Sequence, residues 1–293
     1  MTISNPHPAI SSYPEWRQSK LSTYPLLPEQ LIIDIPDING LTHNIISQMS
    51  KNITKHNFSF YRFENPDQNN KQAVHNLATN RGLIHVDNNL CSDADNLTSI
   101  EVRENRGQHE YVPYTSRPIN WHTDGYYNAD DKQIHGVILH CARPAIEGGM
   151  NYVLDHDIAY ILLKDENPAY IDALCHPNAM TIPANILNGE IIRPEQTGPV
   201  FSYTRDRRIH MRYSARLRNI IWRDDDATQE ALAFLRTLWE SDSPYILSYK
   251  LQAGEGFISN NVLHARTTFK DHNNKEMKRL LYRGRFFDAV NIK

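Results

Sequence analysis

The residues best suited to metal chemistry are His122 and Asp124, which stand two positions apart in the segment NWHTDGYY. In a β-strand, residues i and i+2 point to the same face, so this imidazole and this carboxylate would converge on one point. A third ligand is available at His264, in NNVLHARTTF, where a strand is expected to end near the histidine. Two histidines and one carboxylate leave octahedral positions open, the arrangement by which non-haem iron sites hold a co-substrate and O2.

A second His-x-Asp pair competes with the first. His85 and Asp87, in LIHVDN, have the same spacing at the end of another expected strand. Either pair alone is more often a surface pair than a metal site, and the third ligand at His264 separates the two. The three cysteines are widely and unequally spaced, which favours neither a disulfide framework nor a thiolate cage. Any metal here must therefore use nitrogen and oxygen ligands.

Arginines near the C-terminus form a further candidate site. In KRLLYRGRF, strand alternation would place Arg279, Arg283 and Arg285 on one face. An outward, solvated face is the common explanation for such a pattern. Beside a His-x-Asp…His set, however, an inward guanidinium would bind a carboxylate at two points, as a dicarboxylate co-substrate requires. Arg266 would share a strand face with His264, where it could support the metal ligands from outside.

With these motifs in this order, the chain resembles the taurine dioxygenase (TauD/TfdA) family of Fe(II)- and 2-oxoglutarate-dependent oxygenases. The resemblance is carried by NWHTDGYY, the Gly148-Gly149 turn, NNVLHARTTF and RLLYRGRF, and it extends from about Leu41 to Asp288. It implies a double-stranded β-helix core, jelly-roll or cupin-like, with flanking helices. It also implies Fe(II) as the metal, with 2-oxoglutarate and O2 as co-substrates.

The resemblance assigns three iron ligands, His122, Asp124 and His264. It makes Arg283 the arginine that pairs with the distal carboxylate of 2-oxoglutarate and Arg279 the arginine near the other carboxylate. Asn151 falls where taurine dioxygenase has a threonine that contacts the co-substrate. The interval from His264 to Arg283 is longer than usual in the family, and the polar stretch KDHNNKEMK is expected to be a surface insertion. Because halogenating relatives lack the carboxylate that Asp124 supplies, the expected outcome is hydroxylation with release of succinate and CO2.

Two features of the sequence indicate different classes of substrate. In RDRRIHMRYSARLR, cationic residues alternate with apolar ones up to Arg212, so one strand face could receive a carboxylate, sulfonate or phosphonate, although an outward face would show the same pattern. Aromatic residues around His122 could instead enclose a quaternary ammonium group, as in a γ-butyrobetaine-hydroxylase-like oxidation. We expect a small anionic or zwitterionic metabolite, with Arg117, Asn120, Tyr126 and Arg212 as candidate contacts.

Two other function classes remain open at this point. A zinc-dependent hydrolase could use the same three ligands with a bound water, but it gives the C-terminal arginines no role. A non-catalytic barrel that binds a small ligand would tolerate the loss of any ligand, and here none is missing. Oxygen-dependent release of succinate from 2-oxoglutarate would separate both classes from an oxygenase.

The composition of the chain indicates which classes of binding partner to expect. The 293 residues include 31 Lys+Arg and 34 Asp+Glu, a formal net charge of -3 that argues against a general nucleic-acid binder. No apolar run approaches the roughly 18 to 20 residues needed to span a membrane. The N-terminus lacks the features of a secretory signal. We therefore expect a cytoplasmic enzyme for a small molecule, with homo-oligomer formation left open.

The expected elements are short strands with helices. Residues 1–30 contain five prolines and are expected to form an extended arm, followed by a single domain over 31–293. Helical spacing predicts helices over about 41–53, 71–80, 155–163 and 168–174, and one capped by Asp225 or Asp226. Strand patterns are found over 57–63, 82–86, 97–103, 132–141, 245–251, 256–263 and 280–287. The sequence thus favours a mixed, β-rich sandwich or barrel that carries helices.

Overall fold

The computed structural model describes residues 12–87, 97–102, 112–216 and 218–292. The α-helices of these residues are α1 Tyr13–Leu21, α2 Pro28–Leu31, α3 His43–His56, α4 Lys71–Asn80, α5 His156–Glu166, α6 Pro168–Leu174 and α7 Asp226–Glu240. The strands are β1 Ile32–Ile35, β2 Phe58–Phe63, β3 Thr98–Ile100, β4 Ile119–His122, β5 Gly136–Arg143, β6 Glu147–Gly148, β7 Asn151–Leu154, β8 Met180–Ile182, β9 Asn185–Leu187, β10 Glu190–Arg193, β11 Gln196–Gly198, β12 Phe201–Tyr203, β13 Ile209–Met211, β14 Ile221–Trp222, β15 Leu247–Tyr249, β16 Glu255–Ser259, β17 Leu263–Arg266, β18 Phe269–Lys270 and β19 Leu280–Phe286.

Contacts group the chain into two compact units. The first contains the described residues up to Pro25, together with Trp121–Gln133 and Leu154–Ile246. The second contains Leu26–Asn120, Ile134–Val153 and the chain from Leu247 onward, again for the described residues. Within the part of the chain that the structure describes, every helix is too short or too polar to cross a bilayer.

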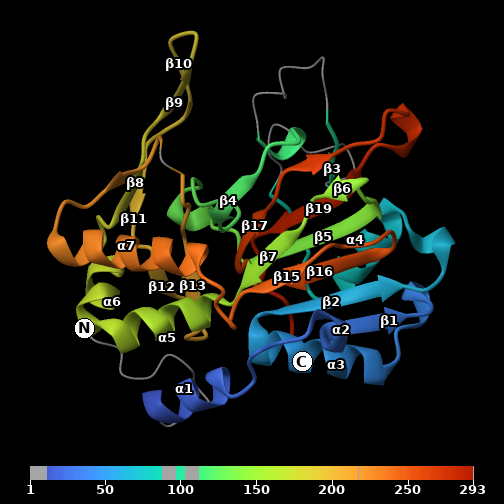
Figure 1. Cartoon of the computed structure of the whole chain (residues 1–293), viewed down its shortest axis with the longest axis horizontal. Helices are drawn as coiled ribbons and strands as arrows, with labels where there is room; N and C mark the ends of the chain where they lie inside the picture. Colours follow the sequence, from blue (N-terminus) through green and yellow to red (C-terminus); the bar gives the residue numbers. More distant parts are fainter. Residues whose placement is uncertain (1–11, 88–96, 103–111, 217, 293) are drawn as a thin grey trace. The chain divides into compact units, whose positions relative to one another are not determined.

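A six-stranded sheet with the order β1-β2-β16-β5-β19-β3 dominates the second unit (Figure 1). β1 runs parallel to β2, and the remaining neighbours are antiparallel. Helices α3 and α4 pack on one face of this sheet, and α4 begins where the side chain of Asn70 accepts a hydrogen bond from the Ala73 amide. The core on this face includes Met49, Ile53, Tyr61, Phe63, Val74, Leu77, Ile138, Ile258 and Phe286.

The opposite face of the same sheet contributes to a second apolar core. β2 alternates between the faces, because Phe58 and Phe60 belong to this second core while Tyr61 and Phe63 belong to the first. Val153 of β7 and Leu247 of β15 join the second core from the four-stranded sheet with the order β15-β7-β17-β4. Two sheets that share an apolar core agree with the expected double-stranded β-helix.

The first unit consists of helices with short strands. Helices α5, α6 and α7 pack against one another, and α7 begins at Asp225, whose side chain accepts a hydrogen bond from the Thr228 amide. The buried stripe of α7 includes Ala231 and Leu235, as the sequence predicts. The unit also holds the three-stranded sheet β11-β8-β14 and the pair β12-β13.

Helix α1 corrects the expected extended arm over residues 1–30. The side chain of Ser12 accepts a hydrogen bond from the Glu15 amide at the start of this helix. Pro14 lies in the first helical turn, where the missing N–H of proline costs nothing. Trp16 is buried with its ring 6.0 Å from that of Tyr160 in α5, which anchors the helix. The rest of the expected arm, residues 1–11, lies outside the described residues, and the single domain over 31–293 stays a prediction.

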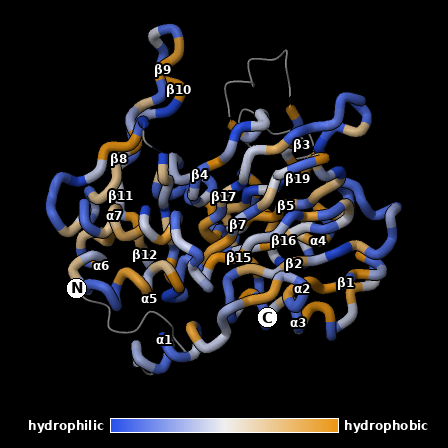
Figure 2. Tube along the Cα trace, viewed as in Figure 1, coloured by the Kyte–Doolittle hydropathy of each residue, from blue (hydrophilic) through white to orange (hydrophobic). Residues whose placement is uncertain are grey.

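Strands β9 and β10 form a separate two-stranded hairpin in the first unit. Figure 2 shows hydrophobic residues along it, and these side chains are exposed. The exposed apolar residues of the hairpin are Ile186, Leu187, Ile191 and Ile192. Asn188 and Gly189 form its turn, and both have a positive φ, as a tight hairpin turn requires.

Candidate metal and co-substrate site

The chain around the first two candidate ligands is fixed by hydrogen bonds within the first unit. The Thr123 amide donates to the Tyr213 carbonyl oxygen at 3.0 Å, and the Tyr213 amide donates to Thr123 Oγ1 at 3.0 Å. The Ala215 amide donates to the Trp121 carbonyl oxygen at 2.7 Å. Gly125, with a φ of +67°, turns the chain directly after the carboxylate ligand. The backbone is therefore held before His122 and between the two ligands.

His264 lies inside β17, one residue after the strand begins, and not at its end as expected. Its Nδ1 atom is 3.0 Å from the carbonyl oxygen of Val262. A carbonyl oxygen only accepts hydrogen bonds, so the neutral ring carries its proton on Nδ1 and its lone pair on Nε2. This contact therefore prepares Nε2 to bind a metal.

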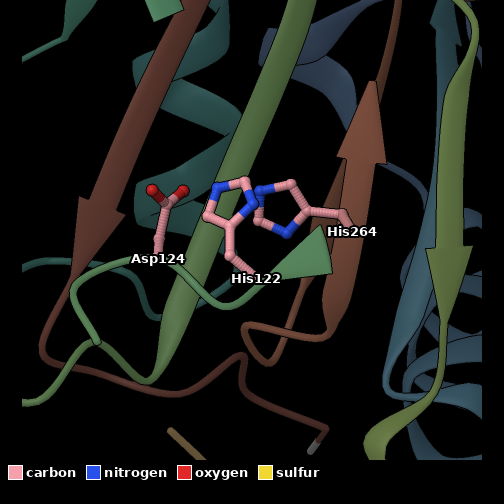
Figure 3. Close-up of side chains that lie close together, drawn as sticks. All are labelled: His122, Asp124 and His264. Carbon is pink, nitrogen blue, oxygen red and sulfur yellow. The ribbon is translucent and has the colours of Figure 1, made fainter. Parts of the chain in front are cut away.

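The three candidate ligands come together in the structure. One ligand atom each from His122, Asp124 and His264 lies within 4.8 Å of the others. Figure 3 shows the two imidazole rings side by side with the carboxylate beside them. Asp124 is buried and both imidazoles are half-buried. Two nitrogen donors and one oxygen donor suit Fe(II), and they leave further coordination positions for other ligands.

The competing pair has other partners. His85 Nδ1 lies 2.9 Å from Asp288 Oδ1, and the carboxylate of Asp288 also accepts the backbone amides of Ile84 and His85. Asp87 forms an ion pair with the buried Arg285. These contacts assign His85 and Asp87 to the structure of the fold.

A second cluster of possible metal ligands already contains a cation. Asp155, His156 and Asp157 lie together and are all buried. Lys20 of α1 places its Nζ atom 2.8 Å from a carboxylate oxygen of Asp155 and 2.7 Å from one of Asp157. The lysine ammonium therefore stands where a metal ion would, and the cluster is an internal ion network.

Arg283 lies in the middle of β19, opposite Leu139 of β5 and Thr98 of β3. Leu281, two positions earlier, packs into the core shared by the two sheets, so Arg283 points to the same side of its sheet. Arg285, two positions later, is buried with Asp87. The arginine face of this strand is therefore directed inward, and the solvated-face alternative is excluded.

Arg279 stands directly before β19, which begins at Leu280 as the strand pattern over 280–287 predicts. Its side chain is buried, and this burial lowers the pKa of the guanidinium to about 10. The group remains charged at neutral pH. The guanidinium carbon lies 4.7 Å from the ring centre of Phe269. A buried, charged guanidinium of this kind suits a bound carboxylate.

Asn151 begins β7, two positions after Gly149 of the Gly148-Gly149 turn. Its Nδ2 atom donates to the Tyr249 carbonyl oxygen at 3.3 Å, and the residue is buried. Gly148 has a positive φ, and a Cβ atom there would lie 2.3 Å from the Thr268 carbonyl oxygen. The turn therefore requires glycine, because the chain passes too close for any side chain. The co-substrate contact expected for Asn151 stays a prediction.

The candidate substrate residues differ in position. Arg117 and Asn120 are exposed, whereas Tyr126 is buried, and burial raises the pKa of its hydroxyl. Arg212 is a correction, because its guanidinium donates to three main-chain carbonyl oxygens at 2.7, 3.1 and 2.9 Å. The carbonyl oxygens belong to Tyr126, Met180 and Gln196. Arg212 thus holds the fold of the first unit together, and its donors do not face a substrate anion.

Sequence reasoning did not identify Phe269. The guanidinium carbons of Arg266 and Arg279 lie 4.8 and 4.7 Å from the centre of its ring. Phe269 lies 3 positions after Arg266 and 10 positions before Arg279, and no spacing in the sequence predicts that both guanidinium groups contact its ring. The KDHNNKEMK stretch is largely exposed, as expected of a surface insertion.

Comparison with known proteins shows which family and which relatives the chain is similar to. A family model described as taurine catabolism dioxygenase TauD, TfdA family matches residues 23–281. A uridine-5'-phosphate dioxygenase from a Streptomyces species is 30% identical over 207 residues, which cover 66% of this chain and 70% of that protein.

Two solved structures share the fold. Asparagine oxygenase in complex with Fe(II), 2S,3S-3-hydroxyasparagine and succinate matches with a TM-score of 0.60 and 18% identity over 84% of this chain and 78% of that chain. The non-haem iron oxygenase OrfP in complex with Fe and alpha-ketoglutaric acid matches with a TM-score of 0.60 and 16% identity over 95% and 90%. These similarities confirm the mixed, β-rich fold class with a cupin-like core.

Proposed function

Because the chain belongs to the TauD, TfdA family of dioxygenases, we propose that it hydroxylates a small anionic or zwitterionic metabolite at iron held by His122, Asp124 and His264. The protein is an oxidoreductase that depends on Fe(II), 2-oxoglutarate and O2, as its family does. Membership of this family argues against a zinc hydrolase and against a non-catalytic barrel. The observation that carries the site assignment is the approach of the three ligand atoms to within 4.8 Å.

Each group of residues has a separate task in this proposal. Bound iron would supply the place where 2-oxoglutarate and O2 react, which no side chain can do alone. His122, Asp124 and His264 hold the metal and leave positions for the co-substrate. Arg283 pairs with the distal carboxylate of 2-oxoglutarate, and Arg279 lies near the other carboxylate.

The burial of Arg279 supports its part in this binding. A guanidinium that burial has stripped of water gains more from a carboxylate than an exposed one does. The inward direction of the arginine face of β19 supports the same assignment for Arg283. Asn151 is proposed to donate its side-chain amide to the co-substrate, the contact that a threonine makes in taurine dioxygenase.

The substrate proposal is narrower than the reaction class. Arg117 and Asn120 lie five and two positions before His122 in the chain, and both residues are exposed, which supports contact with an anionic or zwitterionic substrate. Tyr126 follows the ligands, with its ring 5.2 Å from that of Tyr127 in an edge-to-face contact. The similarity to a uridine-5'-phosphate dioxygenase adds phosphate esters to the anions worth testing.

The first test is an anaerobic titration of the metal-free protein with Fe(II) and then with 2-oxoglutarate, followed by visible absorption. We expect the weak charge-transfer band of iron-chelated 2-oxoglutarate in the wild-type protein and in His85→Ala. We expect no band in His122→Ala, which has lost a ligand. A wild-type protein that binds iron and shows no band would overturn the arginine assignment.

The second test measures oxygen-dependent succinate release with a panel of substrates. The panel contains uridine 5'-phosphate, taurine, asparagine, arginine and γ-butyrobetaine, so that it separates phosphate esters, sulfonates and amino acids from a quaternary ammonium compound. We expect stimulation by an anionic or zwitterionic member that carries no quaternary ammonium group. Stimulation by γ-butyrobetaine alone would replace the proposed class with the quaternary ammonium class.

A further inference from the structure

Arg266 is a buried arginine that donates hydrogen bonds to the backbone of a distant segment. It is the last residue of β17, two positions after His264. Its side chain is 6% exposed. The Nη2 atom donates to the carbonyl oxygens of Thr115 and Arg117, at 2.8 and 2.5 Å. A single guanidinium nitrogen therefore bridges two carbonyl oxygens that are two residues apart.

The segment that accepts these bonds leads directly to a candidate metal ligand. Between the two carbonyl oxygens bound by Arg266, that of Ser116 accepts the Thr268 hydroxyl at 2.9 Å and the Phe269 amide at 3.2 Å. Three successive carbonyl groups, at residues 115 to 117, are thus bound by residues that follow His264. The next strand is β4, which begins at Ile119 and ends at His122.

The guanidinium of Arg266 is fixed by its surroundings. Its carbon lies 4.8 Å from the ring centre of Phe269, which restricts its plane. Its Nε atom is buried and has no hydrogen-bond partner among the described residues. Burying the Nε donor without a partner costs free energy of folding. The two hydrogen bonds of Nη2 therefore have to offset this cost to keep the side chain in place. The main role of Arg266 is therefore to hold the backbone in a fixed position rather than to supply a positive charge.

We propose that Arg266 is a positioning residue of the metal site: by binding the carbonyl oxygens of Thr115 and Arg117, it sets the approach of β4 to β17 and hence the placement of His122 relative to His264. This inference rests on the proposed function, because it takes those histidines as metal ligands. Lysine can replace the arginine only in part, since an ammonium on a flexible chain keeps donors but lacks the rigid planar group that lies against Phe269. The same bonds orient the backbone from which Arg117 projects.

The test compares Fe(II) affinity with folding in four variants. Arg266→Met keeps a long side chain against Phe269 and removes every donor, and Arg266→Lys keeps the charge. Thr268→Val removes the one hydroxyl that binds Ser116. The matched control is Arg81→Met, because Arg81 is equally buried and also donates to a backbone carbonyl oxygen, that of Asn291, without contacting this segment.

For each metal-free variant, we measure the melting temperature and the anaerobic dissociation constant for Fe(II). We expect Arg266→Met to bind Fe(II) about 10- to 100-fold more weakly than wild type, the loss usual when residues behind metal ligands are removed. Arg266→Lys should recover part of this affinity, and Thr268→Val should lose less than Arg266→Met. Arg81→Met should melt at a lower temperature than wild type and bind Fe(II) with unchanged affinity.

Several results would overturn the proposal. One such result is that Arg266→Met binds Fe(II) with an affinity within twofold of wild type. If Arg266→Met does not fold, the same result in both Arg266→Lys and Thr268→Val would overturn the proposal. Another is an equal loss of affinity in Arg81→Met, which would reduce the effect to general destabilisation. If wild type binds Fe(II) and releases no succinate, the proposed function fails, while the affinities still decide the role of Arg266. If wild type does not bind Fe(II), both proposals fail.

Discussion

The buried ion cluster of Lys20, Asp155 and Asp157 permits a sharp stability prediction. Lys20 is 6% exposed, and its ammonium lies 2.8 and 2.7 Å from the two carboxylates. In Lys20→Met, a side chain of similar length leaves two buried carboxylates without their cation. Removing one partner of a buried ion pair costs about 3–5 kcal/mol. For a protein of this size that corresponds to a fall of roughly 6–20 °C in melting temperature.

The pH dependence of the variant gives a second readout. Burial raises the pKa of the Asp155 carboxyl group, and Lys20 opposes this rise. Without the lysine, the pKa of Asp155 should rise further, so the folded state takes up protons more readily than the unfolded state does. Stability then increases as the pH falls. Lys20→Met should therefore regain part of its lost stability between pH 7 and pH 5. In wild type, burial lowers the pKa of Lys20, but the two neighbouring carboxylates together raise it by more, so its contribution is present below pH 10.5 and is lost only above that.

Two controls complete this experiment, which is read from urea and thermal unfolding. Arg17→Met removes an exposed α1–α5 ion pair with Asp165, of 2.6 Å, and should cost under about 1 kcal/mol. The triple variant Lys20→Met/Asp155→Asn/Asp157→Asn should be more stable than Lys20→Met, because no uncompensated charge remains and asparagine can still cap α5. A Lys20→Met protein as stable as wild type, or a triple variant less stable than Lys20→Met, would refute the reasoning.

Three further predictions concern the site. Equilibrium dialysis should show that His122→Ala no longer binds Fe(II) and that His85→Ala still does, since His85 contacts Asp288. The reverse result would assign the metal site to His85 and Asp87. Arg283→Gln should raise the 2-oxoglutarate concentration needed for half-maximal succinate release by about 100-fold, from loss of a desolvated ion pair, with Fe(II) still bound; an unchanged requirement would contradict the assignment. Because burial lowers the pKa of Arg279 to about 10, 2-oxoglutarate affinity should be constant near neutral pH and fall as the pH approaches 10; a constant affinity through pH 10.5 would exclude Arg279 from the binding.

Local signals predicted the elements whose ends are set by their own residues. Helix α4 runs over Lys71–Asn80 as predicted, because Asn70 caps its start and Gly82, with a positive φ, follows its end. The strand expected over 82–86 is wrong apart from a single bridge at Val86. There the amides of Ile84 and His85 donate to the carboxylate of Asp288, some 200 residues away. No local pattern can reveal a partner so distant.

In the candidate site, too, local patterns predicted some features, whereas others depend on contacts that are distant in the sequence. The His-x-Asp spacing identified residues whose ligand atoms do lie together with that of His264. Alternation also indicated the cationic residues around β13, but it cannot tell an anion site from a buried guanidinium bound to carbonyl oxygens, as at Arg212. The position of Arg279 before β19 depends on where the strand starts, which pairing with β5 decides.

The turn of the β9–β10 hairpin has a practical consequence. An added Cβ atom at Gly189 would meet nothing within 4 Å, and Asn188 beside it already has the φ of a tight turn. An exposed turn of this kind, far in sequence from both histidine ligands, is where foreign sequence is best tolerated. An epitope or a fluorophore-labelling peptide inserted between Asn188 and Gly189 would therefore report on the enzyme without entering its core.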